Sequence, residues 1–347
     1  MTDITLKIEG AAYGGWKTVQ LTRSIEQFAQ TFRVGFSESW SQQEEPIPIL
    51  EGQAVAIEVD GETILNGFVE NNQIDYSDDN HTMSVEGRSK TGDLVDSAAI
   101  YRTGQWQNTG LLAIARDLLT DYDITASSET NLGGKFKEFA IQDSETIFEC
   151  LDRAARMKGV LQATDPDGNL LFTRASRTTL TTVLERGVNI LSGSRRGDFR
   201  DRHSRYIVKT QVRGTDEFFG KDASGISRVS VDSDVARERP LILMAEGQET
   251  GAELQKRADW ERNVRAGRSR RLTYTVQDWT NDQGVWDANK LVRVKDSFLR
   301  VDETLLITTA QLLRSNEQGT ITRLELTNKE AFDVEPLPPK KPDNEWI

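Results

Sequence analysis

The sequence predicts an α+β protein that is predominantly β, and three observations support this fold class. Apolar and polar residues alternate over much of the first hundred residues, which is the pattern of half-buried strands. Apolar residues then follow helical spacing between residues 100 and 177, and the alternating pattern returns from about Thr178. We therefore expect two β domains with a small α/β domain between or beside them.

The first β domain is expected at residues 1–99. Val55, Ile57 and Val59 stand at every second position, which predicts a strand with one buried face. The Asp60-Gly61 pair that follows is a strong hairpin signal, so residues 62–69 should form the returning strand.

The small α/β domain is expected at residues 100–177. Residues 108–124 and 143–160 each predict a helix with an apolar stripe, and Asp143 or Ser144 can cap the second helix. Residues 160–175 read as a hairpin whose turn is "TDPDGN". This turn resembles a calcium-binding loop only weakly, because no bidentate Glu follows it.

The second β domain is expected at residues 178–334, and it includes one basic helix. Residues 252–271 carry seven Lys and Arg against three acidic residues, and the helix would bury Leu254, Ala258 and Val264. A solvated helix face is the simplest explanation of this charge. We predict instead that Arg262, Arg265 and Arg268 lie at or near a protein interface. Residues 335–347 are proline-rich and should form an extended tail without a core.

Composition excludes several functional classes. The net charge of −12 disfavours a tight DNA-binding protein. One cysteine, Cys150, and two histidines cannot build a disulfide or a His/Cys metal cluster, and the flanks of Cys150 suggest a buried helical thiol. No apolar run reaches the roughly 18–20 residues of a membrane span, and the N-terminus lacks a signal-peptide pattern. We expect no cofactor and no membrane insertion.

The stretch "EGRSKTGDLVDSAA", residues 86–99, partly resembles a phosphate-binding loop. Such a loop needs Lys and then Ser or Thr directly after its second glycine, whereas Asp93 and Leu94 stand there. We interpret Gly87, Gly92 and Asp93 as a structural turn. The glycines would reach φ > 0 without steric cost, and Asp93 would cap a short helical turn.

Several stretches together resemble the baseplate hub proteins of Mu-like contractile-tail phages. No single stretch is diagnostic, but their order and spacing across almost the whole chain are quite specific. The stretches are "LTRSIEQFAQTF", "GRSKTGDLVDSAAIYRTGQW", "LLAIARDLL", "DSETIFECLDRAARMKGVL", "FRDRHSRYIVKTQV", "DSDVARERPLI", "DWTNDQGVWDANKLVRV" and "LLITTAQLL".

The resemblance implies a fold and a set of partners. Such hubs contain two β-barrel-like domains with α/β decoration, and three copies form a ring that joins the hexameric tail tube to a trimeric spike. The VgrG proteins of type VI secretion share this hub but carry the spike on the same chain, so a separate spike protein is expected here. The family implies a location in the virion tail baseplate, after assembly in the host cytoplasm.

A structural role is the leading hypothesis, and the family implies no catalytic, cofactor or metal residues. An acidic ring would let DNA pass without binding it, because DNA is held mainly by basic residues that release its counterions. The alternative is a tail-associated cell-wall hydrolase that acts through paired carboxylates. An inserted helical lysozyme-like domain would favour that alternative, and the sequence leaves no room for one.

Overall fold

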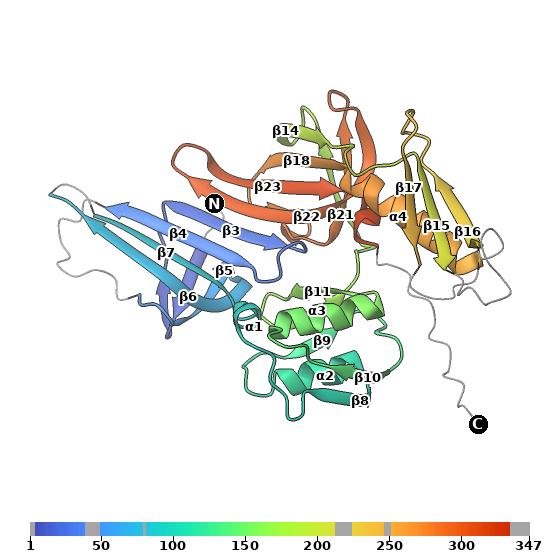
Figure 1. The fold of residues 1–347 in the computed structure, drawn as a ribbon. Coiled ribbons are helices and arrows are strands. Elements are labelled where there is room, and N and C mark those ends of the chain that lie inside the picture. The colour runs from blue at the N-terminus through green and yellow to red at the C-terminus, as the bar shows by residue number, and fades with distance from the viewer. Residues whose placement is uncertain (1–3, 39–48, 79–80, 212–223, 246–250, 334–347) are drawn as a thin grey trace. The chain divides into compact units, whose positions relative to one another are not determined.

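The computed structural model describes residues 4–38, 49–78, 81–211, 224–245 and 251–333, and Figure 1 shows its elements. The chain divides into two compact units. Unit 1 comprises Met1–Arg195 and Leu272–Thr327, and unit 2 comprises Arg196–Arg271 and Asn328–Ile347. The predicted tail at residues 335–347 lies outside the described residues. The predominantly β fold class is confirmed, because the described chain forms 23 strands and four α-helices.

A 13-stranded sheet dominates unit 1. Its strands in the first third of the chain are β1 (Ile4–Ile8), β2 (Ala11–Tyr13), β3 (Thr18–Ser24), β4 (Thr31–Glu38), β5 (Ala54–Val59), β6 (Glu62–Tyr76) and β7 (His81–Ser89). Its later strands are β13 (Thr179–Glu185), β14 (Ile190–Gly197), β18 (Arg270–Gln277), β21 (Lys290–Asp296), β22 (Val301–Ser315) and β23 (Gly319–Thr327). Two short strands, β19 (Thr280–Asn281) and β20 (Gly284–Val285), form a separate pair.

Strand β22 joins the two halves of this sheet. It pairs with β21 up to Ile307, and from Thr309 onward it pairs with β3. The register of β22 against β23 shifts between Ile307 and Thr309, which marks an irregularity at Thr308. The carbonyl of Thr308 accepts hydrogen bonds from the Ile25 amide at 2.9 Å and the Ser24 hydroxyl at 3.1 Å.

The strand order runs β14-β18-β23-β22-β3-β4-β7-β6-β5-β1-β2, with β21 and β13 branching from β22. The described strands therefore form an open sheet and no closed barrel, in contrast to the two barrel-like domains that the resemblance implies. The physical reason is the pairing of β3 with β22, which continues the sheet from one β region into the other.

One hydrophobic core serves both β regions of unit 1. Val55, Ile57 and Val59 are buried as the alternation predicts, and they belong to the same cluster as Tyr274 and Leu305 of the second region. The predicted hairpin at Asp60-Gly61 is also confirmed, because β5 pairs with β6 and both turn residues have positive φ, at 50° and 84°.

A small α/β part follows β7 and has its own core. Its helices are α1 (Gly92–Asp96), α2 (Leu111–Leu118) and α3 (Ile147–Lys158), and its strands are β8 (Gln105–Thr109), β9 (Ala126–Ser128), β10 (Phe136–Ala140), β11 (Leu161–Thr164) and β12 (Leu170–Thr173). The predicted hairpin is confirmed as β11–β12. The predicted cap of α3 is wrong: Thr146 and Glu149 form the capping box, and Ser144 has φ of 66°, unlike the extended backbone of an N-cap.

Unit 2 is a three-stranded sheet covered by one long helix. Its elements are β15 (Arg205–Gln211), β16 (Ser224–Val231), β17 (Pro240–Met244), α4 (Gly251–Arg268) and the 3₁₀ helix η2 (Lys329–Phe332). The central strand β15 pairs with β16 and β17. Leu254, Ala258 and Val264 of α4 are buried, as the sequence predicts.

A buried ion pair anchors the start of unit 2. Arg202 donates from Nε to Asp232 at 2.6 Å and from Nη2 at 2.9 Å, in a bidentate arrangement. The hydrogen bonds that Arg202 donates to Asp232 raise the pKa of Arg202, and burial acts to lower it. A second carboxylate, Asp234, contacts Arg202 at 2.7 Å but is 72% exposed. The geometry satisfies a charge that would otherwise be costly to bury.

We expect Asp232→Asn to lower the free energy of unfolding by about 3–5 kcal/mol, because it leaves the Arg202 charge without its buried partner. The matched variant Asp234→Asn should cost about 0–1 kcal/mol, since its carboxylate is exposed. Urea denaturation followed by circular dichroism measures both values. Equal effects of the two variants would contradict the assignment.

Candidate functional site

The glycine stretch at the end of β7 and the start of α1 is a region of close backbone approach. A Cβ on Gly87 would lie 2.0 Å from the carbonyl oxygen of Phe68 and 2.6 Å from the ring of Phe32. Gly92 is less restricted, since a Cβ there would meet only the flexible Arg88 side chain, at 3.2 Å. Neither glycine has positive φ, so the expected reason for their presence is wrong. Gly87 is needed in strand β7 because there is no space for a side chain.

Asp93 does not cap the helix that follows. Thr91 occupies the N-cap of α1 and makes no side-chain cap bond, and Asp93 lies in the first turn. Burial raises the pKa of Asp93, and the nearby Arg88 opposes this shift. Lys90 binds the carboxylate of Asp123 at 2.6 Å. The lysine of the motif therefore pairs with a carboxylate of the chain itself.

The same stretch carries a buried hydroxyl network. The Ser89 hydroxyl lies 2.8 Å from that of Thr91, which lies 2.7 Å from the hydroxyl of Thr164 at the end of β11. Thr164 donates to the carbonyl of Phe28 at 2.7 Å, and its own carbonyl accepts from Gln30 at 2.9 Å. The network connects the large sheet to the α/β part.

A tight turn makes a second contact at this junction. Gly168, in the β11–β12 hairpin, has φ of 79°, and a Cβ there would lie 2.5 Å from the carbonyl oxygen of Asn66. That carbonyl accepts the amide of Lys90 at 3.0 Å. The "TDPDGN" turn is thus a packing surface. Local sequence could not reveal this contact, since Asn66 and Gly168 are distant in the chain.

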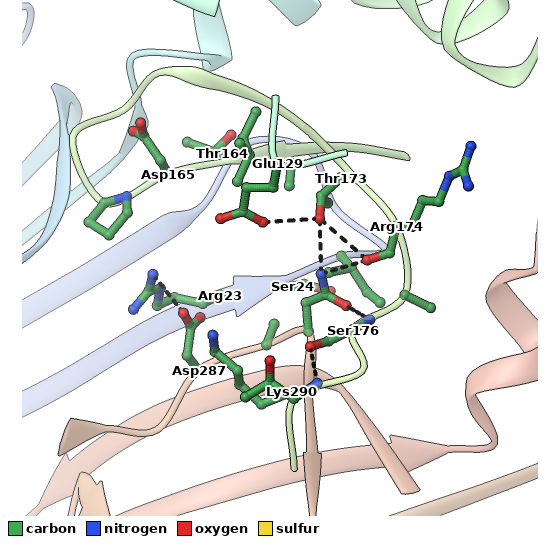
Figure 2. A pocket seen from close by; sticks show the side chains of 18 of the residues that line it. Arg23, Ser24, Glu129, Thr164, Asp165, Thr173, Arg174, Ser176, Asp287 and Lys290 are labelled. Carbon is green, nitrogen blue, oxygen red and sulfur yellow. Dashed lines mark hydrogen bonds and ion pairs between the residues drawn. The ribbon is translucent and has the colours of Figure 1, made fainter. Parts of the chain in front are cut away.

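A cavity of about 690 Å³ opens in unit 1 (Figure 2). Arg23 of β3 projects into it and contacts Asp287 at 3.2 Å, and the Arg23 side chain is only 8% exposed. Asn289 contributes to the lining and accepts the amide of Ser176 at 2.8 Å, while its amide group donates to the carbonyl of Arg174 at 3.0 Å. This cavity could not be predicted from the sequence, because its walls come from segments far apart in the chain.

The chemistry of the cavity is that of a polar structural junction. The described residues that line the cavity include neither His nor Cys. Two of its acidic residues already have partners. Asp287 forms an ion pair with Arg23, and Glu129 accepts a hydrogen bond from the Thr173 hydroxyl at 3.2 Å. In the described part of the chain, no group of His, Cys, Asp and Glu could hold a metal ion.

Cys150 lies in α3 and is fully buried, as its flanking residues predict. Burial is the main cause that raises the pKa of its thiol to about 12. The thiol is therefore protonated at neutral pH, and the nucleophilic thiolate is absent.

The basic helix α4 neutralises part of its charge internally. The buried carboxylate of Glu261 accepts from Arg257 at 3.2 Å and from Arg265 at 3.0 Å, one turn to either side. Arg262 contacts Asn263 at 3.1 Å and lies 4.0 Å from Asp259. Arg268 is exposed. Of the three arginines predicted at an interface, Arg268 thus has the most freedom to meet a partner, and the interface itself stays a prediction.

Three family models match the chain. They are the Mu phage baseplate assembly protein GpP-like N-terminal domain at residues 3–89, the second domain of baseplate hub protein gp44-like proteins at residues 91–174, and the fourth domain of the Mu phage baseplate assembly protein GpP at residues 250–335.

Individual relatives agree with these models. The chain is 33% identical to baseplate hub protein gp44 of Escherichia phage Mu, over 95% of this chain and 89% of that protein. Its fold is similar to the 43 kDa tail protein of prophage MuSo2 from Shewanella oneidensis, with a TM-score of 0.85, 32% identity and coverage of 96% and 99%. A tail protein from Neisseria meningitidis MC58 has a TM-score of 0.78 at 20% identity, with the same coverage.

We expect Gly87→Ala to lower the free energy of unfolding by about 1–3 kcal/mol, because the added methyl overlaps backbone and a buried ring. Gly134→Ala is the matched control. Nothing lies within 4 Å of a Cβ there, and its φ is not positive, so the change should stay within about 0.5 kcal/mol. Urea denaturation distinguishes the two, and similar effects of both would refute the assigned role of Gly87.

Proposed function

Because the chain belongs to the family of Mu phage baseplate hub proteins, we propose that three copies of it form a ring at the centre of a contractile tail baseplate. Family membership rests on the 33% identity to gp44 across 95% of the chain. The protein is a structural component of the virion tail and not an enzyme, in keeping with relatives named as hub and tail proteins. The described part contains no helix that is both long and apolar enough to cross a bilayer.

The presence of two β regions in each chain supports a ring-forming role. Each copy supplies two β regions, matched by the GpP-like N-terminal and GpP fourth-domain models. In a ring of three copies these regions would number six, so a threefold ring can meet a hexameric tube on one side and a trimeric spike on the other. This proposal keeps the four predicted parts of the chain. They are a first β domain at residues 1–99, a small α/β domain at 100–177, a second β domain at 178–334 and an extended tail at 335–347.

The charge of the chain supports passage of DNA through the ring. Each copy carries a formal charge of −12. An acidic channel repels the phosphate backbone and offers little counterion release, so DNA would slide through it without specific binding. The spike and the tail tube, or other baseplate proteins, are the proposed partners on the two faces.

The ring predicts the mass of the purified protein. We expect light scattering to give three times the chain mass of 39.0 kDa at micromolar concentration. Cyclic closure explains why assembly should stop at three copies. A mass of one chain, unchanged at high concentration, would contradict self-assembly of the hub.

The arginines of α4 give a second prediction. Changing Arg262, Arg265 and Arg268 together to Glu should weaken assembly by roughly tenfold, since exposed ion pairs contribute about 0–1 kcal/mol each. Sedimentation at several salt concentrations measures the effect, and salt should weaken the wild type in the same direction.

The matched control for these arginines changes Arg102, Arg116 and Arg156 to Glu. They are exposed arginines of the α/β part, and their reversal alters the net charge equally. Assembly of the control should match that of the wild type. If both triple variants assemble equally well, α4 is not at an interface.

A further inference from the structure

Negative charge is concentrated in the first β region. Residues 1–89 contain 15 Asp and Glu against 5 Lys and Arg, so they account for −10 of the net charge of −12. The remaining residues are nearly neutral. Residues 1–89 are therefore strongly acidic, whereas the rest of the chain carries both signs of charge. The acidic residues of the first part attract basic patches on the second part.

One acidic segment of the first region is well exposed. The end of β6 and the residues after it, 73–78, form what we call the acidic arm. Tyr76 is 85% exposed and Ile74 is 46% exposed, and Asp75 and Asp78 are exposed beside them. Large apolar side chains at a protruding strand end are typical of a segment that contacts another surface.

A basic surface lies around β14, the strand at one end of the strand order. Arg186, Arg195 and Arg300 come from β14 and two adjacent loops, and none of the three forms an ion pair among the described residues. Arg186 stacks over the ring of Phe298 at 5.0 Å, and Arg195 donates to the carbonyl of Leu299 at 3.2 Å. We call this surface the arginine edge.

The arginine edge also exposes apolar side chains. Val188 and Phe298 are each 75% exposed, and Leu191 is 56% exposed. β14 ends the strand order, and seven of its eight residues are exposed. An edge strand with free backbone groups and apolar side chains is normally protected from pairing with another chain. In the strand order β14 has β18 as its only neighbour, so its second edge is open within that sheet.

We propose that the arginine edge of one copy binds the acidic arm of a second copy. Asp75 and Asp78 supply carboxylates for the arginines, and Tyr76 offers an aromatic face to a guanidinium. Ile74 and Tyr76 would cover the apolar side chains Leu191 and Phe298. The inference rests on the proposed self-association of the hub, and it assigns a surface to that association.

This contact has a geometric consequence. The arm and the edge are different surfaces of unit 1, on β6 and β14 (Figure 1). A contact between unlike surfaces can repeat head to tail, so each copy in a closed ring uses one arm and one edge. The arm–edge contact is thus compatible with a closed ring of three copies.

Charge reversal and rescue test the contact. We expect Arg186→Glu with Arg195→Glu and Arg300→Glu to raise the dissociation constant of the oligomer at least tenfold, and Asp75→Lys with Asp78→Lys to do the same. A variant with both sets should recover assembly to within about threefold of the wild type, because the complementarity returns with the signs exchanged. Asp121→Lys with Asp143→Lys, two exposed acidic residues of the α/β part, is the control and should have no effect.

Cross-linking locates the contact directly. Ser77→Cys in the arm and Ser192→Cys in β14 place thiols on the two surfaces, and the buried Cys150 should not react in the folded protein. A bismaleimide should join the two variants only when they are mixed. If the wild type forms a trimer but neither cross-linking nor charge reversal has any effect, the arm–edge contact is refuted and the ring stands. If the wild type never self-associates, both proposals fail.

Discussion

The pairing of β3 with β22 is the constraint on which the rest of unit 1 depends. It aligns residues 19–24 with residues 309–314 and so brings together segments separated by 285 to 295 positions in the chain. The pairing makes one sheet and one core from two β regions. The pairing is possible because β22 stops pairing with β21 before Thr308 and pairs with β3 after it. A fold with such long-range pairing should form slowly, because the entropy of closing a long loop is lost before the stabilising contacts form.

The α/β part is attached to this sheet by chemistry different from that of the core. Three hydroxyl groups, on Ser89, Thr91 and Thr164, form a buried chain between β7 and β11. Each group can both donate and accept, so the chain satisfies its members without charge. Directional bonds fix the position of one part on another more sharply than apolar contact does. These three hydrogen-bonded hydroxyls are therefore well suited to hold the α/β part in one orientation on the sheet.

Local sequence features predicted the local structure well. Alternation located the buried face of β5, and helical spacing located α2 and α3, because both patterns report burial of one face of an element. Features set by distant partners could not be predicted. The requirement for Gly87 comes from Phe32 and Phe68, and the β3–β22 pairing has no signature in either strand alone. For the basic helix, the spacing of Arg257, Glu261 and Arg265 could have indicated the internal ion pairs.

The change of partner at Thr308 also determines how the hub would respond to mechanical force. Six residue pairs connect β22 to β3. Tension along these antiparallel strands would load their hydrogen bonds together in shear, so no single bond would carry the force alone. Tension across the strands would instead open the bonds one after another, as in a zipper. A baseplate that transmits the stroke of a contracting tail therefore gains stiffness when the stroke is directed along β22.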